Sequence, residues 1–162
     1  MDAKPKGQGG RVVLTAAQAL AIHDHMAACY PDEGCGLLTG WGDETTGWRV
    51  AAFHPAPNIH PSPRRHFELD PATHFAVLRQ LRAAELEQGA EKIRLIGHVH
   101  SHPDAAPYPS ATDLALALDP AMLWLIQSIP ASATETPPTA WVARHENGQP
   151  DRFVSMVLAI EG

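Results

Sequence analysis

The chain has 162 residues, of which 44% are hydrophobic and 19% charged, and its formal net charge is -6 at pH 7. This length suits one domain with a full hydrophobic core, while the acidic balance argues against a nucleic-acid partner. No stretch approaches the roughly 20 apolar residues of a membrane-spanning helix, and two cysteines are too few for a disulfide framework, which favours the cytoplasm.

The N-terminal part of the chain predicts a tail, a strand and a helix. Residues 1–9 are polar and glycine-rich, so we expect a mobile tail ahead of one domain over 10–162. A short strand is expected at 11–14. Thr15 is a suitable N-cap for a helix over 16–30, which ends before a proline. Apolar residues at helical spacing mark the buried face of this helix: Ala19, Ile22, Met26 and Tyr30.

A hairpin, a stiff loop and a second helix are predicted next. Two apolar segments, 35–41 and 48–54, flank a polar turn and predict the hairpin. Residues 55–64 hold four prolines and predict a surface loop, because each proline fixes φ and lacks an N–H donor. The helix over 70–89 begins with an aspartate N-cap followed by proline and ends near a glycine. Its expected buried face consists of Phe75, Leu78 and Leu81.

The remaining segments alternate between strands, loops and a helix. In order, we expect a strand over 93–99, a proline-rich loop over 103–109, a helix from about Ser110, a buried strand over 122–129, and a closing hairpin of 141–144 and 153–159 with its turn at Asn147-Gly148. These elements together predict a single domain of mixed α/β (α+β) class.

Potential metal ligands gather in and after segment 97–103, which reads Gly-His-Val-His-Ser-His-Pro. Side chains at positions i and i+2 of an extended chain share a side, so His100 and His102 can face one ion. His98 has the same parity. Asp113, in the first turn of the next helix, can add a carboxylate. Three protein ligands leave a coordination position for water, as in catalytic zinc sites, and this predicts hydrolysis.

A hydrolytic metal site also needs a general base, and Glu33 is the best candidate. It lies between the first predicted helix and the hairpin, next to glycines that let the backbone approach closely. Burial beside an apolar strand would raise its pKa toward the range useful for proton transfer. Glu44, Glu68 and Asp32 are alternative acids that the sequence leaves open.

These residues resemble the JAMM metal motif of the MPN family of metallopeptidases. The spacing matches that motif completely: His100-x-His102, seven residues, Ser110, two residues, Asp113. Segment 30–38 resembles the part of the family that holds its catalytic glutamate, and 124–129 resembles its later core strand. The resemblance therefore covers most of 11–159. It implies one MPN-like domain of the compact prokaryotic type, with a central, partly antiparallel sheet flanked by helices.

The resemblance also implies a chemistry. One zinc ion (Zn2+) per chain would be bound by His100, His102 and Asp113, with Glu33 as the proton shuttle and Ser110 as a hydrogen-bond donor to the developing oxyanion. The implied reaction is attack of metal-bound water on an amide or isopeptide carbonyl. The compact form implies cleavage after the C-terminal glycines of a ubiquitin-like or sulfur-carrier protein, and a peptide substrate stays open, as does the oligomeric state.

Two other functions are compatible with the sequence. A RadC-like domain associated with DNA repair has similar ligand spacing, but the acidic balance and the glutamate segment weigh against it. A non-catalytic, zinc-binding MPN interaction module is the second alternative, and the complete ligand set weighs against it. The chain lacks the H-E-x-x-H motif, which excludes a thermolysin-like protease. Capping alone would also explain Ser110 and Asp113, because S-x-x-D is close to a capping box.

Other histidines and the residues before the first ligand leave further questions open. The family often has aromatic side chains where this chain has His98 and Val99, which could reshape the substrate channel. Hydrogen-bonded or surface positions are expected for most remaining histidines, although a role near the metal or substrate is open for His98, His54, His60 and His66.

Overall fold

The computed structural model describes residues 10–85 and 92–162. The tail predicted at 1–9 and the helix end predicted near Gly89 lie outside the described residues. The elements follow in the order β1 (Arg11–Thr15), α1 (Ala16–Cys29), β2 (Cys35–Asp43), β3 (Gly47–Ala56), α2 (Pro71–Glu85), β4 (Arg94–Pro103), α3 (Ala111–Leu116), β5 (Leu123–Ile129), β6 (Thr139–Glu146) and β7 (Gln149–Glu161).

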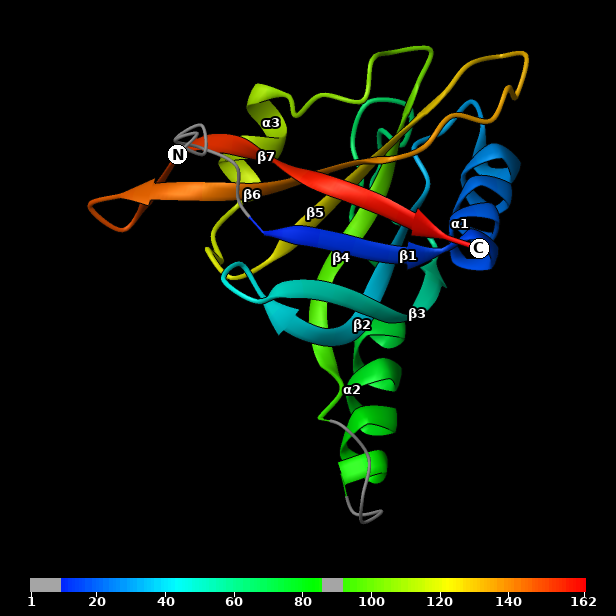
Figure 1. Cartoon of the computed structure of the whole chain (residues 1–162). Coiled ribbons are helices and arrows are strands. Elements are labelled where there is room, and N and C mark those ends of the chain that lie inside the picture. Colours follow the sequence, from blue (N-terminus) through cyan, green and yellow to red (C-terminus); the bar gives the residue numbers. More distant parts are fainter. Residues whose placement is uncertain (1–9, 86–91) are drawn as a thin grey trace, which may run out of the picture.

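The sheet closes on itself as a barrel with the strand order β1-β3-β2-β4-β5-β6-β7 (Figure 1). Strand β1 pairs in parallel with both β3 and β7, which closes the barrel, and β4 pairs in parallel with β5. The four other pairings are antiparallel. The predicted mixed α/β class and partly antiparallel sheet are confirmed, with closure of the sheet as an addition.

Helix α1 forms as its sequence predicts. The Thr15 hydroxyl accepts the Gln18 N–H (3.1 Å), and the Gln18 side-chain oxygen accepts the Thr15 N–H (2.9 Å), which completes a capping box. Ala19, Ile22 and Met26 are buried in the main core together with residues of all seven strands. Tyr30 is half-buried against the same core. The helix therefore fills one end of the barrel interior with its apolar face.

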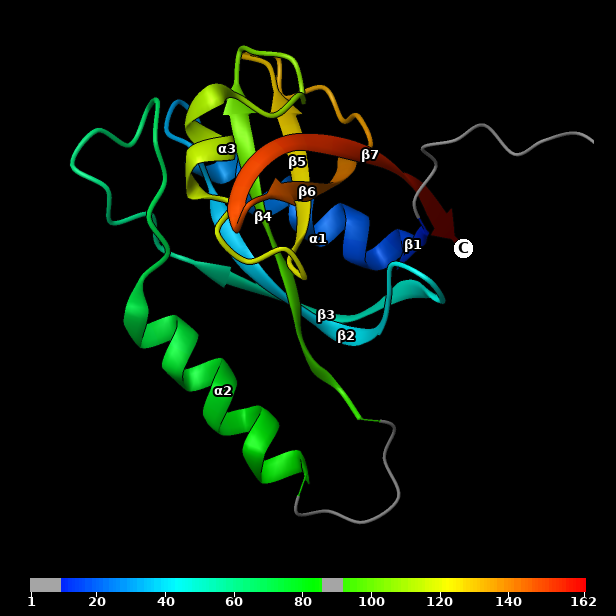
Figure 2. The same cartoon turned by 90° about the vertical axis from the view of Figure 1, so that its left-hand side faces the viewer.

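The predicted buried face of helix α2 is wrong. Phe75 is 61% exposed and Leu78 41% exposed, Leu81 is half-buried, and Val77 is the helix's buried residue. Figure 2 shows the reason, since α2 projects away from the barrel instead of lying along it. Hydrophobic spacing predicts which face of a helix is apolar, but the position of the helix decides whether that face is covered.

Strand β4 runs through the part of the barrel that carries the predicted ligands. It continues to Pro103, four residues beyond its predicted end, because it pairs with β2 on one side and with β5 on the other. The closing hairpin forms as predicted, and Asn147 and Gly148 take the positive φ values that its turn requires. None of the described helices is long and apolar enough to cross a membrane.

Candidate metal centre

The three predicted ligands lie together and point at one another. The Nε2 atoms of His100 and His102 are 3.1 Å apart. Asp113 places Oδ1 at 3.2 Å from His100 Nε2 and Oδ2 at 3.3 Å from His102 Nε2. All three residues are buried, and they form the only group of this kind among the described histidines, cysteines and acids.

Local structure explains why these side chains meet. His98, His100 and His102 share one face of β4, whereas the intervening Val99 packs into the main core on the opposite face. Asp113 enters from the first turn of α3, where its carboxylate accepts the Ser110 N–H (2.8 Å) and the Ser110 hydroxyl accepts the Asp113 N–H (3.0 Å). The capping box thus orients the carboxylate toward the histidines.

The donor set fits a zinc ion. Tetrahedral zinc with bonds of roughly 2.0–2.1 Å holds its ligand atoms about 3.3 Å apart, and the Nε2 atoms of His100 and His102 are 3.1 Å apart, with an Asp113 oxygen at a similar distance from each. His102 Nδ1 lies 2.9 Å from the Ala106 carbonyl oxygen, which can only accept, so Nδ1 carries the proton and Nε2 keeps a lone pair facing the cluster. A backbone carbonyl on the outer nitrogen is typical of metal-binding histidines.

Aromatic rings pack around the first ligand and exclude water from it. Phe67 stacks on the His100 ring with centroids 4.4 Å apart and an interplanar angle of 17°. Trp124 meets His100 edge-on at 5.9 Å and His98 at 4.1 Å. His98 is buried, and this burial together with the nearby His100 lowers its pKa to about 3, so it stays neutral. The structure places His98 in this packing and not among the converging ligand atoms.

Glu33 lies beside this cluster, as predicted. It is 8% exposed and lines the same pocket as Asp113, together with His60, Arg65, His66, Phe67, Glu68, Thr112 and Leu116. Of the alternative acids, Glu68 also lines this pocket, whereas Glu44 pairs with Arg144 elsewhere. His54 bonds to Thr39 on the β2–β3 hairpin and is not among the lining residues.

The electrostatics separate the two carboxylates by role. Burial raises the pKa of Glu33 to about 7, an effect that the nearby His102 opposes and Asp113 reinforces. Burial also acts to raise the pKa of Asp113, but its close contacts with the His100 and His102 imidazoles outweigh it, and the pKa falls below its ordinary range. Asp113 is therefore held as a carboxylate that can bind a cation, while Glu33 can take up and release a proton near neutral pH.

Glu33→Gln is expected to stabilise the metal-free protein at neutral pH. As the pH rises past 4.5, Glu33 ionises in the unfolded chain but stays protonated in the folded one. The free energy of unfolding therefore falls between pH 4.5 and about pH 7, the folded-state pKa, and is constant above it. A neutral amide escapes this loss. We expect the free energy of unfolding to rise by on the order of 1–2 kcal/mol at about pH 8, after allowance for solvent screening, and to stay unchanged near pH 4. Urea unfolding with chelator present measures the free energy of unfolding at both pH values. An equal gain in the variant near pH 4 would contradict the raised pKa as its cause.

Ser110 is exposed at the entrance of α3, and its oxygen accepts the Asp113 N–H. The hydroxyl proton is free to donate elsewhere, so capping and donation to a substrate are compatible. Sequence reasoning missed three residues near the site: Phe67, which stacks on His100, and Asn58 and Ser101, whose side chains bond to the main chain of Glu33 and of Gly34. Ser101 stands between two predicted ligands and Asn58 within a proline-rich loop, which are weak signals, and nothing in the sequence pattern marks Phe67.

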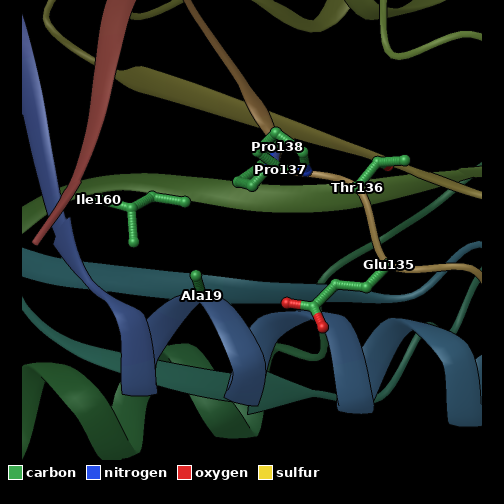
Figure 3. A pocket seen from close by; sticks show the side chains of 6 residues that line it. All are labelled: Ala19, Glu135, Thr136, Pro137, Pro138 and Ile160. Carbon is green, nitrogen blue, oxygen red and sulfur yellow. The ribbon is translucent and has the colours of Figure 1, made fainter. Parts of the chain in front are cut away.

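A second pocket lies between α1, the segment before β6 and the end of β7 (Figure 3). Its lining residues are Ala19, Glu135, Thr136, Pro137, Pro138 and Ile160. Glu135 is its one ionisable side chain, so this pocket brings together no set of catalytic or metal-binding groups. The chemistry of the described residues is concentrated at the pocket of Glu33 and Asp113.

Known proteins resemble this chain over most of its length. Residues 15–153 match the family described as prokaryotic homologs of the JAB domain. A desampylase of Haloferax volcanii is 34% identical over 131 residues, which cover 81% of this chain and 80% of that one. A probable TtuB-protein conjugate cleaving protease of Thermus thermophilus is 36% identical over 111 residues, covering 68% and 66%. The solution structure of a Desulfitobacterium hafniense protein superposes with a TM-score of 0.69 at 28% identity, covering 93% and 94%.

Proposed function

This chain belongs to the family of prokaryotic JAB-domain homologs and is a hydrolase of the isopeptidase type, and we propose that it uses one zinc ion to release a ubiquitin-like or sulfur-carrier protein from its conjugates. One observation carries the proposal: the side chains of His100, His102 and Asp113 converge, and Asp113 lines the same pocket as Glu33. The set supplies a cation site and a proton carrier at one place, which is what amide hydrolysis requires.

The chain's own residues account for the proton transfers of this reaction. A bound zinc ion would supply polarisation of the scissile carbonyl and a lower pKa for the attacking water. The Glu33 carboxylate takes the proton of that water as its oxygen bonds to the carbonyl carbon. Glu33 then delivers the same proton to the amine nitrogen as the C–N bond breaks. The products are a carboxylic acid and an amine, and Glu33 returns to its carboxylate form. Its pKa of about 7 suits acceptance and release alike.

Ser110→Ala is expected to lower the turnover rate by about 10²–10³-fold, because the free hydroxyl proton would no longer reach the developing oxyanion. The same change removes the N-cap of α3 and should cost about 1 kcal/mol of stability. Steady-state kinetics beside urea unfolding separates the two effects. Ser110→Asp serves as the control, since it keeps a capping oxygen but lacks a hydroxyl donor, and wild-type turnover in that variant would exclude the oxyanion role.

The substrate class is proposed from the relatives. Two of them are named as a desampylase and as a probable TtuB-protein conjugate cleaving protease, and the second name states that its substrate is a protein conjugate. We extend that class of substrate to this chain, with cleavage after C-terminal glycines. A cytoplasmic location is part of the proposal and depends on the argument from two cysteines.

The test is cleavage by the purified chain loaded with zinc. Two probes are compared: a ubiquitin-like protein joined through its terminal Gly-Gly to a lysine side chain, and the same protein with a linear extension after Gly-Gly. Mass spectrometry should find a new terminus at the second glycine, with cleavage lost in chelator and restored by added zinc. Bound zinc without cleavage of either probe would refute the isopeptidase and favour an interaction module.

A further inference from the structure

The main-chain N–H and carbonyl groups of Glu33, the proposed general base, and of Gly34 are all hydrogen-bonded. The Glu33 N–H donates to the Pro63 carbonyl (2.8 Å), and the Glu33 carbonyl accepts from the Asn58 amide nitrogen (2.9 Å). The Gly34 N–H donates to the Ser101 hydroxyl (2.8 Å), and the Gly34 carbonyl accepts the Ser101 N–H (3.0 Å). Ser101 joins this dipeptide to the ligand strand β4, while Asn58 joins it to the loop on the other side.

The side chain of Asn58 has its full set of hydrogen-bond partners. Besides Glu33, its amide nitrogen donates to the His66 carbonyl at 2.9 Å and lies 3.5 Å from the Pro63 carbonyl. Its oxygen accepts the N–H groups of His60 (3.1 Å) and Glu68 (3.0 Å). A primary amide offers two N–H donors and an oxygen with two lone pairs, so these contacts use its whole capacity.

Through these bonds Asn58 also organises the wall of the pocket. The loop over 57–70 is folded back on itself by an antiparallel bridge between Asn58 and Leu69. The returning arm carries Phe67, which stacks on the ligand His100. The Asn58 side chain thus holds both the main chain of Glu33 and the arm whose Phe67 covers His100.

We propose that Asn58 is a positioning residue for Glu33. The proposal rests on the proposed function, because the place of Glu33 affects a rate only if Glu33 carries the proton. Asn58 bonds to main-chain atoms and acts through Glu33. A displacement of about 1 Å in a catalytic group can cost about 10²-fold in rate. Loss of the amide should therefore lower kcat by about 10–10²-fold, with KM within about threefold and zinc content unchanged.

The experiment compares Asn58→Ala and Asn58→Asp with Gln18→Ala. Aspartate keeps an oxygen for His60 and Glu68 but turns an acceptor toward the Glu33 carbonyl, so it isolates the donor bond. Gln18 is the matched control, because its amide bonds to the main chain of Val50 and Ala51 (both 3.1 Å), away from the metal pocket. All variants are loaded with zinc and assayed on the ubiquitin-like protein with a linear extension after Gly-Gly.

A second measurement, independent of turnover, is amide hydrogen exchange at Glu33 by NMR. Asn58→Ala should raise this exchange rate at least about tenfold relative to Gln18→Ala, since the loop that accepts the Glu33 N–H loses its anchor. Wild-type kcat in Asn58→Ala or Asn58→Asp, or Glu33 exchange no faster than in Gln18→Ala, would overturn the proposal. Failure of the proposed function would give a different result: the wild-type protein would show slow exchange at the Glu33 amide but would not cleave the probe.

Discussion

Glu33→Gln is expected to lower the rate of conjugate cleavage by about 10²–10⁴-fold while zinc stays bound. The amide has nearly the shape of the carboxylate but cannot accept the proton of the attacking water or pass it to the leaving amine. The three ligand side chains are retained, because Glu33 is not a member of the cluster that would hold the ion. Single-turnover kinetics on the lysine-linked probe, with zinc measured on the same sample, gives both quantities.

Two other carboxylates make this test specific. Glu44→Gln is the control for loss of one negative charge, because Glu44 lies past the far end of β2 and pairs with Arg144. Glu68 lines the metal pocket and is the competing base. If Glu68→Gln lost activity while Glu33→Gln kept it, the role of base would pass to Glu68. Wild-type rates in both variants would remove the proton-transfer scheme altogether.

His102→Ala is expected to abolish both zinc binding and cleavage. The change leaves two donor groups, His100 and Asp113, and two ligands do not hold the ion against water as three do. Zinc should fall from about one ion per wild-type chain to less than about a tenth, as measured by mass spectrometry of metals after gel filtration. Activity should fall to background and stay there when zinc is added at micromolar concentration.

A second variant separates ligand loss from misfolding. His102→Ala also removes the bond to Ala106, whereas Asp113→Asn keeps an oxygen that can accept the Ser110 N–H and so preserves the start of α3. Both variants should lose zinc. His74→Ala, an exposed histidine on α2, is the control that should keep it. A full zinc complement in folded Asp113→Asn would show that the ion is held elsewhere.

The ligand set is the part of the site that local sequence rules predict. The two-residue period of a strand puts His100 and His102 on one side of β4, and the capping pattern of Ser110 and Asp113 starts α3 where the carboxylate can turn back. Helix α1 follows the same logic through its cap at Thr15 and its apolar spacing. Each of these arguments uses residues within about one strand or helical turn of one another.

Glu33 could be proposed from its segment, but its position depends on tertiary structure. It reaches the metal pocket because β2 pairs with β4, which sets Cys35 opposite His100, and because Ser101 bonds to Gly34 across 67 positions of sequence. Choosing Glu33 over Glu68 also needs its burial, since both acids line the pocket. Pairings between distant segments are selected by the packing of the whole barrel, which no local pattern contains.

The sequence by itself determined the residue types, the spacing of three ligands on one strand and the following helix, and the mixed class of the fold, because these follow from backbone periodicity and capping within short segments. Only the tertiary structure decided that the barrel closes through β1 and β7, that α2 leaves Phe75 exposed, and that Asn58 joins the base to the wall of the pocket. Those features depend on contacts between segments far apart in the chain. Local backbone preferences permit several such arrangements, and the one observed is the one that buries the apolar side chains and pairs the buried polar groups of the whole molecule.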